Sequence, residues 1–401
     1  YGLVGSEMCI RDRFMEALSG DAANDANLIG QFGVGFYSAF LVAHRVELTT
    51  RHASAGAEGG VRWISDGEGE YTIESITREE RGTTITLFLR EEDKEFVEDF
   101  RLRGIISRYS DHISLPIEMP SEDKEKKEEW EPVNNGSALW SRPKNEVSEE
   151  DYHRFYQSLS YDTETPLATL HNRVEGNLEY TSLFFIPKKA PFDLWDREQR
   201  HGINLYVRRI FIMDDAKYLM PSYLRFVRGV VDAADLPLNV SREFLQNNKD
   251  IDRIRSASVK KILSELSRLA EKEPETYAAF WKEFGKVLKE GVVEDHDNRT
   301  VLADLMRFNS TRSDDTEQTE SLAAYFKRMP MKQKAIYYIT AESHSAASTS
   351  PHLEIFRKND VEVLLLSDPV DEWLVSSLNE YKDKPLKSVA TGALDLGDLA
   401  S

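Results

Sequence analysis

LIGQFGVGFYSAFLVAHRVELTT, residues 28–50, is the stretch that decides the fold of the first part of the chain. Three glycines fall in one short loop, at Gly30, Gly33 and Gly35. An apolar run from Phe36 to Ala43 then suits a helix, and residues 45–50 alternate as a strand does. The loop either cradles a phosphate or only forms a tight turn that lets the helix pack closely.

The glycine spacing is GxxGxG, which differs from the dinucleotide-binding pattern GxGxxG. It also differs from the Walker loop, because no Lys followed by Ser or Thr closes it. A phosphate held here would therefore be bound by backbone N–H groups, for which glycines permit a close approach and the start of a helix offers a favourable dipole. From this pattern alone, both the phosphate site and the structural turn stay open.

The residues after the loop predict an antiparallel sheet. Residues 61–76 read as a hairpin that turns at residues 66–69, and residues 82–90, GTTITLFLR, form a strand rich in β-branched side chains. Residues 95–113 show helical spacing, and residues 114–119 are predicted to form a final strand. The charge run SEDKEKKEE, residues 121–129, then indicates an exposed linker.

The second part of the chain predicts an α/β layer pattern. A helix follows the N-cap Ser148, and strands are predicted at residues 179–187 and 203–212. Apolar residues at helical spacing form one stripe between Val259 and Leu269. From Ser321 onward, helices alternate with buried strands, which indicates a small parallel-sheet unit. The fold class predicted for the whole chain is therefore α+β.

Six segments are expected along the chain. Residues 1–13 match neither a signal peptide nor the hydrophobic periodicity of the residues after them, so we expect them to be non-native, and we expect the chain to be truncated at its carboxyl end. The segments are 1–13; 14–120, the C-terminal part of a nucleotide-binding domain; 121–138, a charged linker; 139–250, a large α/β subdomain; 251–312, a helical segment; and 313–401, a small α/β subdomain.

Composition excludes several classes of protein. With 40% hydrophobic and 30% charged residues, the 401-residue chain is typical of a globular protein, and it has no apolar run of about 18 residues that could span a membrane. A net charge of −19 disfavours a general nucleic-acid binder. Cys9 is the only cysteine and no histidines fall at zinc-ligand spacing, so we expect no disulfide, no metal site and a cytoplasmic protein.

Two sets of motifs carry a resemblance to a known family. IGQFGVGFYSAFLVAHRV, residues 29–46, together with RGTTITLFLR, residues 81–90, resembles the nucleotide-binding domain of the heat-shock protein 90 chaperones. That domain belongs to a superfamily with gyrase, histidine kinases and mismatch-repair ATPases. Residues 139–156, 171–195 and 223–246 are similar to the middle domain of the same family. The resemblance extends from Phe14 to the end, and the short linker is similar to that of bacterial members.

The resemblance implies an ATP site. Backbone groups would close on the terminal phosphates at Gln31, Gly33, Val34, Gly35 and Phe36. Thr83 would contact the adenine through its hydroxyl, directly or through water, although a threonine at this place could equally pack across strands.

The resemblance also implies catalytic residues in LPLNVSREFLQ, residues 236–246. Arg242 would reach the γ-phosphate and neutralise charge that develops during phosphoryl transfer, and Gln246, one helical turn later, would support the same region. Without the resemblance, Arg242 beside Glu243 would read as a solvated helix charge.

Aromatic residues between positions 140 and 195 have two interpretations. Most of them are expected in the core. Because the family contacts client proteins in this region, Trp140 and Trp195 are the candidates for an exposed apolar patch.

The resemblance further implies residues that this sequence does not contain. Family members carry a general-base glutamate, an asparagine that helps to hold magnesium and an aspartate that reads the adenine amino group, all upstream of the glycine loop, and a C-terminal dimerisation domain. We therefore expect half a nucleotide pocket, apolar surface left uncovered on the first domain, and no ATP hydrolysis by this chain alone.

The implied function is that of an ATP-dependent molecular chaperone of the stress response, which remodels unfolded or partly folded clients. It would use ATP and Mg, act as a homodimer and accept co-chaperones. Two alternatives stay open: a nucleotide-independent protein-interaction module, and another ATPase or kinase of the superfamily. A histidine kinase would need a phospho-accepting histidine helix, and a mismatch-repair protein a basic DNA-binding surface.

Overall fold

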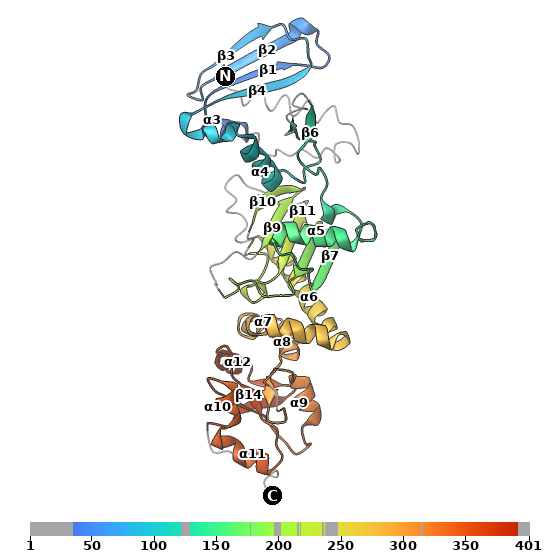
Figure 1. Ribbon diagram of the computed structural model, residues 1–401, viewed down its shortest axis with the longest axis vertical. Helices are drawn as coiled ribbons and strands as arrows, with labels where there is room; N and C mark the ends of the chain where they lie inside the picture. The colour runs from blue at the N-terminus through green and yellow to red at the C-terminus, as the bar shows by residue number, and fades with distance from the viewer. Residues whose placement is uncertain are drawn as a thin grey trace. The chain divides into compact units, whose positions relative to one another are not determined.

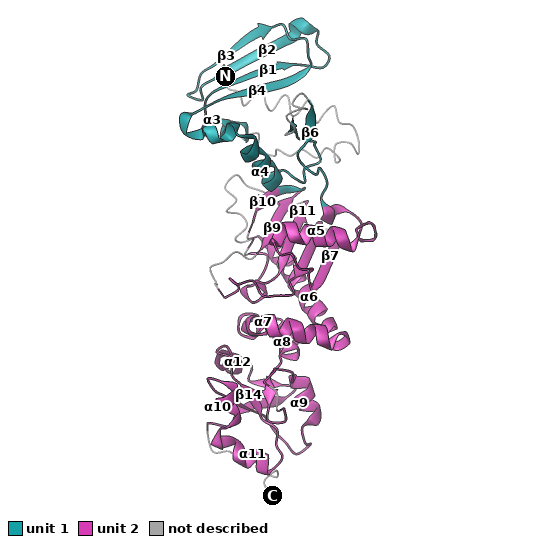
Figure 2. Cartoon of the chain, viewed as in Figure 1, with its two compact units in different colours: residues 1–138, 208–210 teal, residues 139–207, 211–401 magenta. Residues whose placement is uncertain are grey.

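The computed structural model of the chain describes residues 35–121, 129–176, 178–195, 202–214, 216, 218–234, 236, 248–313 and 316–391. The chain divides into two compact units, which Figure 2 shows in different colours. The first unit comprises residues 1–138 and 208–210, and the second comprises residues 139–207 and 211–401. Each unit combines helices with sheets, so the predicted α+β class is confirmed. None of the helices among the described residues is long and apolar enough to span a membrane.

The first unit contains a four-stranded antiparallel sheet in the order β3-β2-β1-β4 (Figure 1). Its strands are β1 (Ala43–Arg51), β2 (Gly60–Ser65), β3 (Tyr71–Ile76) and β4 (Gly82–Leu89). The predicted hairpin is confirmed, because β2 and β3 join through a turn in which Gly67 and Gly69 have φ values of +81° and +100°. Glycine adopts such values without strain.

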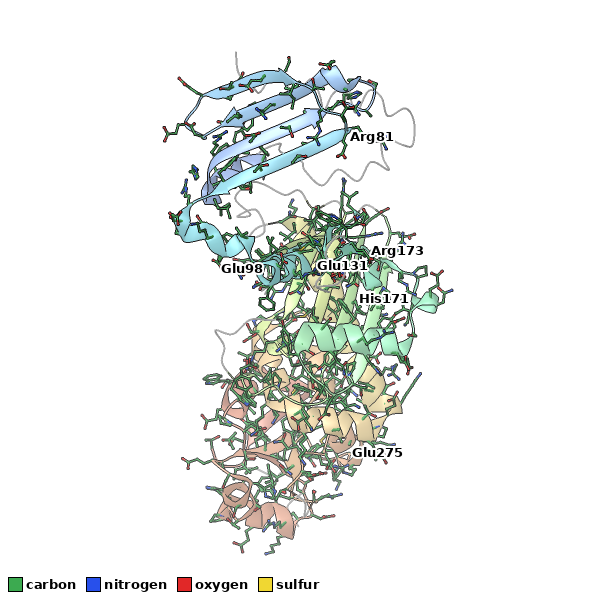
Figure 3. All side chains as sticks on the ribbon, turned by 45° about the horizontal axis from the view of Figure 1, so that its top comes forward. Arg81, Glu98, Glu131, His171, Arg173 and Glu275 are labelled. Carbon is green, nitrogen blue, oxygen red and sulfur yellow. The ribbon has the colours of Figure 1, made fainter. Side chains whose placement is uncertain are left out.

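The other elements of the first unit are short. They are η1 (Gly35–Ser38), α3 (Ala39–Val42), η2 (Ala57–Gly59), η3 (Glu91–Val97), α4 (Asp99–Tyr109), β5 (Glu118–Pro120) and β6 (Trp130–Pro132). The predicted helix at residues 36–43 is confirmed as a 3-10 turn followed by α3, except that Ala43 opens β1. Figure 3 labels Glu131 of β6, which forms an ion pair with Arg103 of α4 at 3.1 Å.

The final strand predicted at residues 114–119 is wrong in its position. The strand begins only at Glu118 and pairs with β6 in a separate two-stranded sheet. The preceding backbone is held by a side chain instead of a neighbouring strand: Ile117 N donates to Asn134 Oδ1 at 2.8 Å, and Asn134 Nδ2 donates to Leu115 O at 3.0 Å. A side chain that satisfies backbone groups in this way competes with strand pairing.

The second unit begins with a five-stranded sheet in the order β10-β9-β11-β8-β7. The strands are β7 (Ala168–Val174), β8 (Tyr180–Ile186), β9 (Ile203–Val207), β10 (Ile210–Met213) and β11 (Arg228–Ala233). The single strand predicted at residues 203–212 is wrong. The chain turns back at Arg208 and Arg209, whose φ values are +51° and +65°, and the two halves become neighbouring strands.

Helix α5 (Glu149–Ser160) begins as its sequence predicts. The side chain of the N-cap Ser148 accepts a hydrogen bond from Asp151 N, and the Asp151 carboxylate accepts one from Ser148 N, which makes a capping box. Three short 3-10 turns accompany this part of the unit: η4 (Leu139–Ser141), η5 (Lys144–Glu146) and η6 (Ser222–Leu224).

Three helices follow the first sheet: α6 (Lys249–Lys272), α7 (Pro274–Glu294) and α8 (Arg299–Leu305). The predicted stripe on α6 is confirmed, since its five apolar residues are all buried: Val259, Ile262, Leu263, Leu266 and Leu269. Helix α7 packs through Phe280 and Phe284, whose rings lie 5.5 and 4.7 Å from that of Phe226.

The C-terminal α/β part, residues 309–391, contains a second five-stranded sheet in the order β12-β14-β13-β16-β15. Its strands are β12 (Asn309–Ser310), β13 (Ile336–Thr340), β14 (Leu364–Leu366), β15 (Glu380–Tyr381) and β16 (Lys384–Ser388). Its helices are α9 (Leu322–Arg328), α10 (His344–Ser348), η8 (Pro351–Leu353), α11 (Glu354–Lys358) and α12 (Asp371–Ser377). The predicted parallel pairing is confirmed at the centre, where β13 runs parallel to both β14 and β16.

Trp140 lies in the core of the second unit, so its prediction as an exposed contact residue is wrong. The side chain is 1% exposed, and its indole Nε1 donates to Asp232 Oδ2 at 2.8 Å. Its ring lies 4.7 Å from that of Tyr206. His171, labelled in Figure 3, contacts Trp140 O through Nε2 at 2.9 Å, and burial lowers the pKa of this histidine. A large ring whose N–H has a hydrogen-bond partner is well suited to a buried position. The hydrophobicity of the tryptophan alone does not indicate whether it is buried or exposed.

We predict that Trp140→Ala lowers the free energy of unfolding by about 3–5 kcal/mol, because it removes a buried ring and leaves Asp232 without the indole donor. Urea unfolding followed by circular dichroism measures the effect. Trp195→Ala is the matched control: this tryptophan is 55% exposed, so a change of less than about 0.5 kcal/mol is expected. An equal decrease in the free energy of unfolding for both variants would contradict the burial of Trp140.

Candidate functional site

The predicted site residues divide into two groups. Gly35, Phe36 and Thr83 lie in the described part of the first unit. The other five lie outside the described residues: Gln31, Gly33, Val34, Arg242 and Gln246. The described flanks of the segment that carries Arg242 are strand β11, which ends at Ala233, and helix α6, whose N-cap Asn248 accepts a hydrogen bond from Asp250 N at 2.8 Å.

The four-stranded sheet has one apolar and one polar face, because successive side chains of a strand point to opposite sides. In register across the strands, Ile85 lies opposite Leu48, Leu48 opposite Trp63, and Trp63 opposite Ile73. The other face carries Arg62, whose guanidinium lies 3.1 Å from the Glu47 carboxylate. The apolar face, which carries Leu48 and Trp63, is therefore the candidate surface for a nucleotide.

Phe36 brings the end of the glycine loop onto this apolar face. Its ring packs edge-on against Trp63, with centroids 5.8 Å apart and an interplanar angle of 65°. Gly35, directly before it, is exposed, and a Cβ added there would meet nothing within 4 Å. Its carbonyl accepts a hydrogen bond from Ser38 Oγ at 2.6 Å, which closes the first turn. The described end of the loop thus lies over the apolar face through Phe36, and Gly35 is exposed.

Helix α3 is fixed to the sheet at two further points. Arg90, at the end of β4, donates from Nη2 to Phe40 O at 3.0 Å and from its backbone N to Val42 O at 3.0 Å. The Phe40 ring lies against Gly67 of the β2–β3 turn, where an added Cβ would approach Phe40 Cδ1 to 2.7 Å. The position of α3 therefore depends on contacts with Arg90 and Gly67, which lie far from the helix in the sequence. Local sequence patterns do not predict such contacts.

Thr83 makes the cross-strand contact that the sequence left open as an alternative. It lies opposite Thr50, and the two hydroxyl oxygens are 2.8 Å apart. Thr50 Oγ1 also donates toward Gly82 O at 3.3 Å. Because a threonine hydroxyl has one donor and two acceptor sites, this pair leaves Thr83 capacity for another hydrogen bond. Register places Thr83 on the same face as Ile85 and Trp63.

Large apolar side chains on this face remain exposed to solvent, as expected from the sequence. They are Tyr71 at 47%, Ile73 at 60%, Ile85 at 50% and Leu87 at 39%. An apolar surface with a few polar groups at its border suits a flat heteroaromatic ligand. Among the described residues, no cluster of three or more His, Cys, Asp or Glu side chains is placed to hold a metal ion.

A second candidate surface is the aromatic loop, residues 187–195, between β8 and β9. Trp195 is 55% exposed, as predicted, and Phe192 is 96% exposed. Phe184 and Phe185 of the preceding strand are buried.

Buried charges hold the aromatic loop in place. Arg225, only 6% exposed, donates from Nε to Leu194 O at 2.7 Å and bonds the Glu290 carboxylate of α7 at 2.8 and 3.0 Å. Glu283 of the same helix accepts a hydrogen bond from Ala190 N at 2.9 Å. The backbone on both sides of Phe192 is thus anchored while its ring is presented to solvent. No sequence motif marked Arg225 for this role.

Comparisons with known proteins agree with the resemblance seen in the sequence. A family model described as Hsp90 protein matches residues 120–400. The chain is 61% identical over 392 residues to a chaperone protein HtpG from Nitrosococcus oceani, and 58% identical over 393 residues to one from Methylococcus capsulatus. Each alignment covers 96% of this chain but 62% of the relative. The chain therefore spans about three fifths of the length of these curated relatives.

Proposed function

Because the chain belongs to the Hsp90 family, we propose that it works as part of an ATP-dependent molecular chaperone that binds and remodels client proteins. The observation that carries the proposal is the apolar face of the four-stranded sheet, where Phe36 and Thr83 border exposed apolar side chains. This face offers a surface for the adenine beside the end of a loop suited to phosphates. The whole protein is proposed to act in the cytoplasm as a homodimer, with co-chaperones as further partners.

In the proposed site, Thr83 contacts the adenine, and the terminal phosphates are bound by backbone groups of Gln31, Gly33, Val34, Gly35 and Phe36. Arg242 neutralises charge on the γ-phosphate during transfer to water, and Gln246 supports the arginine. Positioning and electrostatic stabilisation account for catalysis in such a site, so no covalent intermediate with the protein is needed. Mg²⁺ would neutralise phosphate charge, and the resemblance implies for it an asparagine upstream of the glycine loop that this sequence does not contain.

The aromatic loop is the proposed contact for clients. Unfolded or partly folded proteins expose apolar side chains, and an exposed phenylalanine and tryptophan on an anchored backbone can bind them at low cost in conformational entropy. This surface also supports the second candidate function, a nucleotide-independent interaction module. The two functions differ in one observable, since only the ATP-driven chaperone changes its client affinity when nucleotide binds.

We predict that Thr83→Val weakens ATP binding by up to about tenfold, because it removes one hydrogen bond to the adenine while keeping the branched shape. Isothermal titration of the full-length protein with ATP measures the change. Thr86→Val is the matched control, since Thr86 lies on the opposite face of the same strand. An affinity that falls equally in both variants, or in neither, would argue against an adenine contact at Thr83.

We predict that Arg242→Ala lowers kcat for ATP hydrolysis by the full-length protein by about 10³-fold with little change in ATP affinity, because the guanidinium acts on charge that develops in the transition state. Phosphate release at saturating ATP measures it. Arg253→Ala serves as the control, because Arg253 is an exposed arginine of α6 paired with Asp250. This variant should hydrolyse ATP at the rate of the parent protein. Unchanged turnover in Arg242→Ala would remove this residue from the site.

We predict that Phe192→Ser/Trp195→Ser weakens binding of an unfolded client about tenfold or more, because it removes two exposed aromatic anchors. Fluorescence anisotropy with a labelled, reduced and carboxymethylated protein measures the affinity. Trp130→Ser is the matched control, because Trp130 is a similarly exposed tryptophan, 65% exposed, on β6 of the other compact unit. Equal losses for the control and the double variant would indicate unspecific hydrophobic binding.

A further inference from the structure

Helix α7 carries a fully buried lysine on the side that faces the C-terminal α/β part. Lys289 is 0% exposed, and its Nζ lies 2.8 Å from Asp368 Oδ2 and 2.8 Å from Asp371 Oδ1. Asp371 opens helix α12, which packs against α7 (Figure 1). The ammonium group thus lies between two carboxyl groups, and burial raises the pKa of Asp371. The Phe308 ring lies 4.9 Å from the ammonium group.

A third element completes this charged cluster, which we name the Lys289 cluster: Lys286, Lys289, Gln318, Asp368 and Asp371. Gln318 donates from Nε2 to Asp368 Oδ2 at 2.8 Å and accepts from Trp281 Nε1 at 3.0 Å. Lys286, one turn before Lys289, lies 3.6 Å from Asp368 Oδ1. Burial alone would raise the pKa of Asp368, but Lys289 and Gln318 hold that pKa below its ordinary value, so the carboxylate is ionised.

The next residue along the same helix is connected to the aromatic loop through Arg225. Glu290 bonds Arg225, which in turn holds Leu194 O, and Glu283, two turns earlier, holds Ala190 N. Two neighbouring residues of α7, Lys289 and Glu290, therefore connect the helix in two directions. One leads to the C-terminal α/β part and the other to the loop that presents Phe192 and Trp195.

The packing of α7 allows little independent movement between these connections. Gly291 is in close contact with Tyr223, because an added Cβ would approach Tyr223 Cδ2 to 2.8 Å. Phe226, next to Arg225 in the chain, packs on Phe284 of the helix. A closely packed helix transmits displacement rather than absorbing it, since interiors have low compressibility.

We propose that helix α7 couples the C-terminal α/β part to the aromatic loop, so that the Lys289 cluster controls how the client-contacting aromatics are presented. The regulatory meaning of this coupling rests on the proposed client contact at the aromatic loop. Buried ion clusters add little net stability over apolar packing but define one geometry, and breaking one partner leaves uncompensated charge. The cluster thus fixes the position in which α7 meets α12, and the loop follows α7.

Hydrogen exchange followed by mass spectrometry tests the coupling without nucleotide or client. In Lys289→Met, amide exchange in the peptide covering residues 187–195 should accelerate about tenfold, because the anchors of Ala190 and Leu194 shift with α7. Exchange in β7 and β8 should not change, which separates coupling from global destabilisation. Lys282→Met is the matched control: Lys282 lies on the same helix, exposed, 4.0 Å from Glu317, and should have no effect on the loop.

A second variant keeps the test decisive if Lys289→Met does not fold. Lys289→Met/Asp368→Asn/Asp371→Asn removes all three charges at nearly constant shape and should accelerate loop exchange in the same direction. The proposal is overturned if exchange accelerates in residues 364–377 while residues 187–195 remain as protected as in the parent protein. That result would leave the chaperone proposal intact, because client binding by Phe192→Ser/Trp195→Ser is measured separately.

Discussion

The constraint on which the second unit depends is the burial of the Lys289 ammonium group. A charge with no exposure to water is tolerated only where opposite charges and hydrogen bonds surround it. Asp368 and Asp371 supply the opposite charges, and Gln318 donates a hydrogen bond to Asp368. These partners come together only when α12 lies against α7. Removing one partner would leave an uncompensated charge in the interior, which is strongly destabilising.

The first unit depends on a simpler constraint, the alternation of its strands. One face of the sheet is apolar across all four strands, from Ile85 to Ile73. Burying this face requires other apolar groups to pack against it. Phe36 already occupies part of this face through Trp63, and Thr83 adds a hydroxyl at its border. In both units, the proposed binding surfaces combine exposed apolar side chains with a few hydrogen-bonded polar groups.

Local patterns predicted much of the fold. Hairpin β2–β3, the capped start of α5 and the apolar stripe of α6 depend on neighbouring residues only, and each was predicted. Contacts between distant residues were not predictable in this way. The turn at Arg208 and Arg209 has positive φ without a glycine to mark it, and Trp140 is buried because Asp232, 92 positions later, accepts its N–H. The exposure of Phe192 depends on such contacts as well, since Arg225, paired with Glu290, holds the backbone of the aromatic loop at Leu194.

The central claim for the function is that ATP, bound at the glycine loop and reached by Arg242, drives the chaperone, and a distance measurement tests it most directly. Spin labels at Glu68 and Glu149, one exposed residue in each compact unit, report the separation of the units in the full-length protein. If ATP bridges the glycine loop and Arg242, a non-hydrolysable ATP analogue should shorten and narrow the distance distribution, and Arg242→Ala should abolish the change. A distribution that is the same with and without saturating analogue would contradict an ATP-driven cycle and favour the interaction module.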